Sequence, residues 1–341
     1  MVSGIVGYGV YIPWCRIKLS DIAEAWGRNF KFPVEKAVPF YDEDAITMAS
    51  EAAQNAIEHA GVDSAQIGAV FLGTTTNPYL EKQGSSILAS TIGAKPEAMV
   101  ADFTGSARSS TQALIACLDA LNSGRIDYGL VVGADMLVGP PGDFAEYLMS
   151  SGAGALVIGQ EEIIAEVEGS YSYTTEFTEK WRSASNPFPK ATLERFARNY
   201  GYVHHVVAAG KGLMENLRKK PEDFKHAVFS QPDLRYPSKA AREFGLSQDQ
   251  IAQGMVAQFV GYTGASSLLV GLATILDKAK PKERILAVSY ANGGSDAFSV
   301  RPLEKIEEKR QDAVGEYLNK KKYVNYATYL RYNRIFDRIA R

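Results

Sequence analysis

An internal repeat constrains the fold of this chain more than any other feature of its sequence. The apolar run at 223–229 resembles the run at 67–71, and equivalent valines in the two runs lie 158 residues apart. The run at 285–290 resembles the run at 128–133, with valines 156 residues apart. A fixed offset indicates repeated structural units, so the sequence predicts two similar halves of about 160 residues that join near 160–170. The alternative is that any two segments built from a strand and a helix share this pattern.

Strands and helices alternate in the first half. Residues 42–60 place apolar side chains three and four positions apart behind an acidic start, and Gly61 follows, so this segment predicts a helix. Short apolar runs that end in small polar residues are typical of buried strands. The expected order is helix 42–60, strand 69–73, helix 84–93, strand 99–103, helix 108–123 and strand 128–133. This alternation predicts an α/β fold.

The composition is that of an ordinary globular protein. The chain has 341 residues, of which 46% are hydrophobic and 22% charged, so one large domain or two medium ones are expected. The 37 basic and 39 acidic side chains give a net charge of −2, which argues against nucleic acid as the main partner. An anionic ligand would therefore need a local cluster of positive charge.

Cysteine, histidine and hydropathy exclude further classes. Cys15 and Cys117 are too few for a disulfide framework, and with four histidines they leave little for a metal site, so we expect no metal. This cysteine usage favours the reducing cytoplasm. The N-terminus has no basic segment followed by a long apolar stretch, and no apolar run is long enough to span a bilayer. We therefore expect neither secretion nor membrane spanning.

Six short strings point to one known family. They include Gly-Tyr-Gly-Val-Tyr-Ile-Pro and Gly-Ser-Asp-Ala-Phe, and they lie at 7–13, 141–143, 151–155, 231–232, 294–298 and 322–329. These strings resemble the archaeal-type 3-hydroxy-3-methylglutaryl-CoA synthases, which belong to the thiolase superfamily. The resemblance covers almost the whole chain.

That resemblance implies the thiolase fold, an α/β architecture. In this fold, two βαβαβαββ halves related by a pseudo-twofold axis form a five-layered αβαβα sandwich, which agrees with the internal repeat. We expect an N-terminal half at 1–165 and a C-terminal half at 166–341, the second ending in a Tyr-rich helix. Ala107 is expected at the start of a buried central helix.

The resemblance also implies a Claisen-type condensation. In the family, a cysteine at the N-terminus of a buried helix takes the acyl group from acetyl-CoA, and the helix dipole lowers the pKa of its thiol. A glutamate acts as acid and base, while a histidine and an asparagine hold the thioester oxygen and the incoming substrate. Four positions can therefore be compared with this sequence.

This sequence differs from the family pattern at all four positions. Ala107 stands where the cysteine is expected, and its methyl group cannot attack a thioester. Thr75 takes the place of the glutamate, and a hydroxyl is no general base near neutral pH. Ser230 replaces the histidine of a Phe-His-Gln-Pro string, and Tyr262 replaces the asparagine of Gly-Asn-Thr. The larger tyrosine ring is expected to protrude into the space of the acyl group.

Other groups nearby are weaker candidates. Ser106 and Ser109 lie next to Ala107 in the sequence, but a serine nucleophile needs an adjacent base and none is apparent. Cys117 is ten residues further along the same expected helix, about 15 Å away, and is interpreted as a core residue. Glu81 is interpreted as a surface-loop carboxylate, although it could swing toward the site.

Loss of all four groups from a retained scaffold predicts a non-catalytic subunit of a thiolase-type complex that transfers acyl groups or forms or cleaves carbon–carbon bonds. Residues 73–79 also resemble, more loosely, a turn in the synthase-like subunit of the phloroglucinol-acetylating complex. The acyl chemistry of that complex resides in a separate subunit. A competing hypothesis is an enzyme with remodelled acyl-transfer chemistry that uses Ser106 or Ser109. A third is an isolated dimer that binds acyl-CoA or serves as a scaffold.

The resemblance further implies association with other chains. Thiolase-fold dimers pair central strands across the interface, so the strand at 99–103 is expected to pair with a second copy or with a catalytic thiolase-fold subunit. A small zinc-ribbon/OB-fold protein is a further partner that the resemblance implies. Residues 323–335 predict an amphipathic helix rich in Tyr and Arg, which would form a second contact between chains or pack on its own subunit.

Coenzyme A or an acyl-CoA is the ligand that the resemblance implies, with no covalently bound cofactor. Basic residues follow the join, in the region where the family meets the nucleotide and the pantetheine arm. The candidates are Arg182, Arg198 and Lys211, with Lys190, Arg195 and Lys239 nearby. The alternative is that these side chains lie on a solvated helix face.

Overall fold

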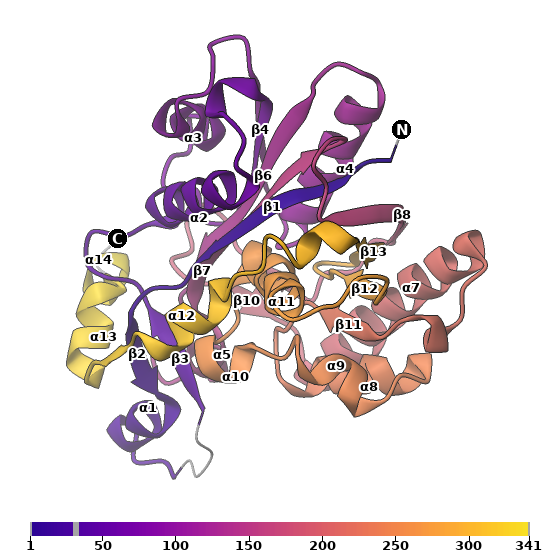
Figure 1. Ribbon diagram of the computed structural model, residues 1–341. Coiled ribbons are helices and arrows are strands. Elements are labelled where there is room, and N and C mark those ends of the chain that lie inside the picture. Colours follow the sequence, from indigo (N-terminus) through magenta and orange to yellow (C-terminus); the bar gives the residue numbers. More distant parts are fainter. Residues whose placement is uncertain (1, 30–33, 340–341) are drawn as a thin grey trace.

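A mixed sheet of nine strands runs through the molecule (Figure 1). The computed structural model describes residues 2–29 and 34–339. Five strands precede residue 160: β1 (Gly4–Tyr11), β4 (Ile67–Gly73), β5 (Met99–Phe103), β6 (Tyr128–Met136) and β7 (Ser151–Gly159). Four follow it: β8 (Ala165–Thr174), β11 (His226–Phe229), β12 (Ile285–Val288) and β13 (Gly294–Pro302). Their order across the sheet is β5-β4-β6-β7-β1-β8-β13-β12-β11.

The pattern of strand pairing repeats across this sheet. β4 is parallel to β6, and β6, β7 and β1 are successively antiparallel. In the same way, β11 is parallel to β12, and β12, β13 and β8 are successively antiparallel. The apolar runs whose offsets predicted a repeat therefore occupy equivalent strands. The two sets meet where β1 pairs with β8 through Gly4–Glu166 and Ile5–Ala165, and the boundary expected at 165 falls on the first residue of β8.

Helices form three layers around the two parts of the sheet. They are α2 (Ala45–Ala60), α3 (Gly84–Ile92), α4 (Ser109–Asn122), α7 (His204–Leu217), α8 (Arg235–Phe244) and α11 (Ser267–Leu276). One hydrophobic core joins α4 and α11 to strands of both parts, so these two helices form the central layer. α2 and α3 cover the outer face of the first part, and α7 and α8 cover that of the second. This is the αβαβα sandwich that the resemblance implied.

Local sequence sets the ends of α2. The Asp44 carboxylate accepts hydrogen bonds from amides of the first turn, including that of Thr47 at 2.9 Å, and Gly61 ends the helix with φ of 65°. The helix begins at Ala45, three residues later than predicted, because the acidic residues at 42–44 precede and cap it instead of forming its first turn.

The C-terminal tail packs on its own subunit, and its strand β14 is the edge strand of a three-stranded sheet. The elements here are β2 (Cys15–Lys18), β3 (Glu35–Val38), β14 (Lys322–Tyr323), α1 (Leu19–Ala25), α12 (Ala313–Asn319), α13 (Tyr326–Tyr332) and α14 (Ile335–Ile339). Tyr329 is 2% exposed in the core between α1, β2 and β3. Lys36 of β3 donates to the Tyr329 hydroxyl and to the Met149 carbonyl, both at 3.0 Å. The tail thus forms an edge strand and two short helices instead of one long amphipathic helix.

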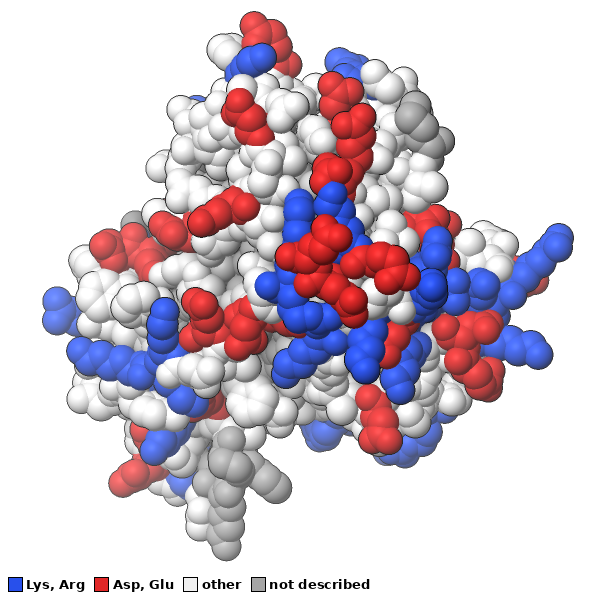
Figure 2. Space-filling view, in the orientation of Figure 1, with Lys and Arg blue, Asp and Glu red and all other residues white. Residues whose placement is uncertain are grey.

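The remaining elements are short and lie mostly in the C-terminal half. They are α5 (Phe144–Leu148), β9 (Lys180–Trp181), β10 (Lys190–Ala191), α6 (Glu194–Phe196), a π-helical segment (Ala197–Val203), α9 (Gln248–Ala252) and α10 (Ala257–Val260). Figure 2 shows basic and acidic side chains intermixed on one face of the molecule. Within the described ranges, no helix is both long and apolar enough to cross a membrane. In the same ranges, no group of three or more His, Cys, Asp or Glu side chains is placed to hold a metal ion.

Candidate functional site

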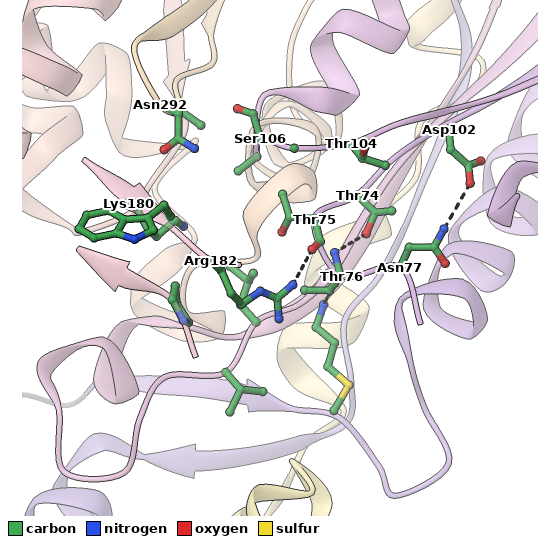
Figure 3. Close-up of a pocket in the computed structure, with 18 of the residues that line it drawn as sticks. Thr74, Thr75, Thr76, Asn77, Asp102, Thr104, Ser106, Lys180, Arg182 and Asn292 are labelled. Atoms are coloured by element: carbon green, nitrogen blue, oxygen red, sulfur yellow. Dashed lines mark hydrogen bonds between the residues drawn. The ribbon is translucent and has the colours of Figure 1, made fainter. Parts of the chain in front are cut away.

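A polar cavity of about 740 Å³ opens where β4 and β5 end and α4 begins (Figure 3). Residues 74–77 follow β4 and residues 104–107 follow β5, and both segments line the cavity. Because β4 and β5 are parallel, the two segments emerge at the same edge of the sheet. The lining also includes residues 79–80, 82–83, 102, 136–138, 149, 180–182, 189 and 291–292. The structure therefore brings Thr75 and Ala107 to a single cavity.

Asp135 shapes the cavity from behind. Its carboxylate is fully buried in β6 and accepts hydrogen bonds from the hydroxyls of Thr74, Thr75 and Thr76, at 3.1, 3.0 and 2.8 Å. It also accepts from the Thr75 amide at 2.7 Å and from the Ala265 amide at 2.8 Å. The Thr75 hydroxyl is thus bound into the turn. Our reading of the sequence missed Asp135, whose only signal is an acid inside an apolar strand.

Close backbone contacts place the central helices against the strand ends. A Cβ atom at Gly73 would overlap the backbone of Ser110 in α4. One at Gly133 would lie 2.7 Å from the Ala265 carbonyl oxygen, just before α11. Glycine at these two positions therefore allows the N-terminal ends of both helices to approach the cavity.

A buried ion pair ties the start of α4 to the C-terminal half. Arg108 donates from Nε and Nη2 to the Asp296 carboxylate of β13, at 2.9 and 3.1 Å. The hydroxyls of Thr111 and Ser172 donate to the same carboxylate, at 2.7 and 2.6 Å. Separating the two residues would leave an uncompensated buried charge, and this energetic cost holds the start of α4 against β13. Our reading of the sequence did not assign a role to either charged residue.

Ala107 and Tyr262 belong to one apolar cluster. Ala107 is 8% exposed and lies two residues before the first residue of α4, as expected. The cluster also contains Leu137, Met149 and Ala291. Burial raises the pKa of the Tyr262 phenol well above its ordinary value, so this ring is a neutral, space-filling group near neutral pH.

Ser230 and Glu81 lie apart from the polar cavity. Ser230 is 3% exposed, and its hydroxyl accepts from the Tyr290 amide at 3.2 Å. Its carbonyl accepts from the Tyr202 hydroxyl at 2.6 Å, so this residue sits behind Tyr290. Glu81 is exposed on the loop before α3 and is not part of the cavity wall.

The candidate nucleophiles occupy different environments. Ser106 lines the polar cavity, and its Oγ accepts from the Arg108 amide at 3.3 Å. Ser109 is fully buried outside the cavity wall, and the structure gives its hydroxyl no hydrogen-bond partner. The Ser110 hydroxyl donates to a backbone carbonyl. Cys117 is fully buried in the core, and burial raises the pKa of its thiol to about 12, which agrees with its interpretation as a core residue.

A second, more apolar cavity of about 680 Å³ lies next to the first. Tyr262, Tyr236, Phe144 and Leu148 are among its walls. Five residues line both cavities and form a partition between them: Met149, Lys180, Trp181, Pro189 and Ala291. Ala107 faces the polar side of this partition, and Tyr262 faces the apolar side.

The three basic residues expected to bind coenzyme A do not lie together. Arg182 lines the polar cavity and donates from Nη2 to the Thr75 carbonyl at 2.9 Å. Arg198 pairs with Glu194 at 2.8 Å, and Lys211 is exposed on α7. Neither of these two belongs to the wall of either cavity. Only Arg182 of the three is therefore placed to meet a ligand in a cavity.

The sequence of this chain is similar to those of thiolase-fold proteins. The thiolase N-terminal domain family matches residues 33–160, and together with the layered sheet this defines a thiolase-fold protein. The hydroxymethylglutaryl-CoA synthase of Methanosarcina mazei is 43% identical, over 97% of this chain and 98% of that protein. The synthase of Pyrococcus horikoshii is 42% identical, over 97% and 96%. The chain belongs to the hydroxymethylglutaryl-CoA synthase family.

Solved structures agree on the fold. MvaS in complex with 3-hydroxy-3-methylglutaryl coenzyme A superposes with a TM-score of 0.87 at 19% identity, over 97% of this chain and 91% of that one. A 3-oxoacyl-[acyl-carrier-protein] synthase III from Aquifex aeolicus superposes with a TM-score of 0.79 at 19% identity, over 88% and 99%. At such identities the likeness establishes the fold alone.

Proposed function

We propose that this chain is a non-catalytic, hydroxymethylglutaryl-CoA synthase-like subunit of a thiolase-type complex that transfers acyl groups or forms or cleaves carbon–carbon bonds. In this proposal the chain binds an acyl-CoA, and a thiolase-fold partner supplies the nucleophile. The observation that carries the proposal is Ala107, whose methyl group stands beside the cavity at the start of α4.

The electrostatics of a helix N-terminus explain why the residue at position 107 decides whether the chain can accept an acyl group. Backbone N–H groups and the helix dipole at an N-terminus stabilise a thiolate, which makes it a suitable place for a nucleophilic cysteine. A methyl group there can accept no acyl group. Ser106, which precedes Ala107 in the chain, carries a hydroxyl on the cavity wall, and no His, Asp or Glu among the described residues is hydrogen-bonded to it. A serine without a base is a weak nucleophile.

The three other family positions support the same proposal. Asp135 binds the Thr75 hydroxyl into the turn, so this group is not free to move protons. The Tyr262 ring fills an apolar cluster beside the partition, and the phenol has a raised pKa. Ser230 lies outside both cavity walls. None of the three offers a group that titrates near neutral pH.

Acyl-CoA is proposed as the ligand because of the relatives and the shape of the site. MvaS, whose structure has this fold, was solved with 3-hydroxy-3-methylglutaryl coenzyme A. The apolar cavity, at about 680 Å³, lies within the size range of small-molecule sites. Its walls would accommodate an acyl chain or a pantetheine arm, with Lys190 at the same cavity.

A second candidate function is an enzyme with remodelled acyl-transfer chemistry. Two observations favour it: the relatives that are more than 40% identical are named hydroxymethylglutaryl-CoA synthases, and Ser106 lines the polar cavity. In this case the Ser106 oxygen would form an ester with the acyl group, and coenzyme A would leave as the thiol with the serine proton. Ser109 is buried away from the cavity and is not favoured.

Intact-mass spectrometry after incubation with labelled acetyl-CoA or acetoacetyl-CoA separates the two functions. We expect no acyl adduct on the wild-type chain. The Ala107→Cys variant is expected to gain an adduct, because a thiol at the start of α4 has the electrostatic support that the position offers. An adduct on wild-type Ser106 that disappears in Ser106→Ala would overturn the non-catalytic function. An adduct on Cys117 instead of the introduced thiol would show that Ala107 is not the acyl-accepting position.

We also propose that β5 pairs with another chain. β5 bonds to β4 on one side, and no described strand covers its other edge. Its side chains, which include Met99, Val100 and Phe103, are half-buried. An open apolar edge favours pairing with a further strand. The proposed partner is a second copy or a catalytic thiolase-fold subunit, with a zinc-ribbon/OB-fold protein as a third component of the complex.

A further inference from the structure

A third cavity, of about 510 Å³, shares no wall residue with the two cavities described above. It opens where β1 ends and where β2 and α2 begin. Aromatic and acidic side chains make up most of its wall, which consists of Tyr11, Trp14, Cys15, Phe40, Asp42, Glu43, Thr47 and Glu51. A wall of this composition suits a ligand that is attracted both to aromatic rings and to negative charge.

Two aromatic rings at this cavity are open to solvent. Trp14 is 60% exposed and Phe40 is 50% exposed. Tyr11 is fixed from behind, because its ring meets that of Tyr317 edge-on at 5.6 Å between centroids and its hydroxyl donates to the Glu43 carboxylate. Among the described residues, no lysine or arginine lies over the Trp14 or Phe40 ring. These ring faces are therefore free to receive a cation from another molecule.

The three carboxylates at the cavity lack a cationic partner. Within the part of the chain that the structure describes, Asp42, Glu43 and Glu51 form no ion pair, and the carboxylates of Asp42 and Glu51 accept no hydrogen bond. Burial raises the pKa of the Glu43 carboxyl. The charges of Asp42 and Glu51 raise it further, whereas two hydrogen bonds to its oxygens oppose the shift. The three groups thus repel one another, and a cation placed among them would relieve that repulsion.

Basic side chains near this cavity stay outside its wall. Arg16 and Lys322 are close enough to Cys15 to act on its thiol. The Arg16 guanidinium is fully buried, however, and donates to the backbone carbonyls of Cys15 and Tyr317, each at 3.1 Å. Lys322 is exposed on β14. The charged groups on the wall itself are all acidic, which favours a positively charged ligand.

An arginine side chain of another protein matches this combination of groups. A guanidinium stacks on aromatic faces and donates to carboxylates from a fixed planar fork, and arginine is enriched among the residues that dominate protein interfaces. A small free cation would leave the outer edges of Trp14 and Phe40 in water. A protein surface that inserts an arginine would cover them as well, and exposed apolar groups at a concave site favour such a contact.

We infer that this cavity binds an arginine side chain from a basic segment of a partner protein, through the rings of Trp14 and Phe40 and the carboxylates of Asp42 and Glu51. The inference goes beyond the proposed function, because it assigns a protein-binding site to a part of the molecule that includes neither the edge of β5 nor the two cavities proposed for a ligand.

Calorimetric titration with two blocked hexapeptides at low ionic strength tests the inference. One peptide carries arginine at its two central positions, and the other carries citrulline, a neutral analogue of similar shape. We expect the arginine peptide to bind about tenfold more tightly, as a cation–π contact together with a charge-assisted hydrogen bond provides.

Variants locate the preference for the charged peptide. Trp14→Ala and the double variant Asp42→Asn/Glu51→Gln should lose most of it. Glu58→Gln removes an exposed charge near the other end of α2 and should keep it. All the replaced side chains are exposed, so circular dichroism should report wild-type folding in each variant.

The possible results are distinct. Absence of binding by the arginine peptide, or equal binding of the two peptides, overturns the inference. A preference that falls as far in Glu58→Gln as in the double variant would assign it to net charge and also overturn the inference. Binding of tetramethylammonium as tight as that of the arginine peptide would assign the cavity to a small organic cation instead of a protein. These variants should bind acyl-CoA as the wild type does, so the proposed function is tested separately.

Discussion

At the residue scale, one buried carboxylate, that of Asp135, fixes the backbone around the polar cavity. Asp135 accepts hydrogen bonds from three consecutive threonines and from the Ala265 amide, so one carboxylate fixes a turn and the approach to α11. Such contacts join residues 59 to 130 positions apart and leave no periodic signal in the sequence. This is why the motif comparison found Thr75 and missed the residue that holds it.

The Asp135→Asn variant is expected to be less stable by about 2 kcal/mol or more, because five donors lose a charged acceptor and the new NH2 group must face at least one of them. Urea denaturation followed by circular dichroism measures the change. Asp63→Asn is the matched control, since Asp63 is an exposed capping residue and asparagine caps equally well. Equal midpoints for the two variants would contradict the role given to Asp135.

The buried amine of Lys36 is expected to make the free energy of unfolding depend on pH. It is 1% exposed, and burial lowers the pKa of its amine to about 7. An unfolded chain keeps this lysine protonated to about pH 10.4, so from about pH 7 upward the unfolded state holds a proton that the folded state has released. The free energy of unfolding should therefore rise between about pH 7 and 8.5, by at most about 1.4 kcal/mol per pH unit.

Urea denaturation across this pH range measures the slope. The Lys36→Met variant should lose the contribution, because it has no proton to release. Lys18→Met, which replaces an exposed lysine, should keep the wild-type slope. A slope that is the same in Lys36→Met and wild type would show that Lys36 is not its source.

At the scale of elements, the bounds of a helix or strand could be predicted wherever a pattern within that segment alone determines them. The helices at 45–60 and 109–122 and the strands at 67–73 and 99–103 lie within three residues of expectation. The tail was predicted less well, because Tyr and Arg at helical spacing describe an amphipathic surface but not the strand pairing of Tyr323 with β2. The location of Ser230 behind Tyr290 likewise depends on tertiary packing.

Close packing of α4 on β4 yields a prediction at this scale. Gly73→Ala would force α4 away from the strand end, because the new methyl group overlaps the Ser110 backbone. We expect a loss of about 1–3 kcal/mol in the free energy of unfolding. Gly169→Ala is the control, since its methyl group would meet only the end of the Leu217 side chain, at 3.2 Å. Thermal or urea unfolding compares the two, and a Gly73→Ala variant as stable as the control would contradict this packing argument.

At the scale of the whole molecule, the nine-stranded sheet ends in an unpaired edge at β5. We therefore expect the chain to form a dimer or a larger complex in solution. Static light scattering at micromolar concentration should return about twice the 37.2 kDa subunit mass, or a larger mass with a thiolase-fold partner. Pairing of β5 with a strand of a second chain would cover this edge, which promotes aggregation when it is exposed. A stable monomer under both conditions would contradict the proposed subunit role.

The shared central layer has a consequence for how the chain folds. α4 and α11 contribute to one core that also contains side chains of β1, β6, β12 and β13, whereas the two parts of the sheet meet through only two residue pairs. A fragment cut near residue 165 would expose one side of that core, so neither half is a self-sufficient folding unit. The two halves therefore share a topology but do not fold independently. Calorimetry should record a single cooperative unfolding transition for the whole chain.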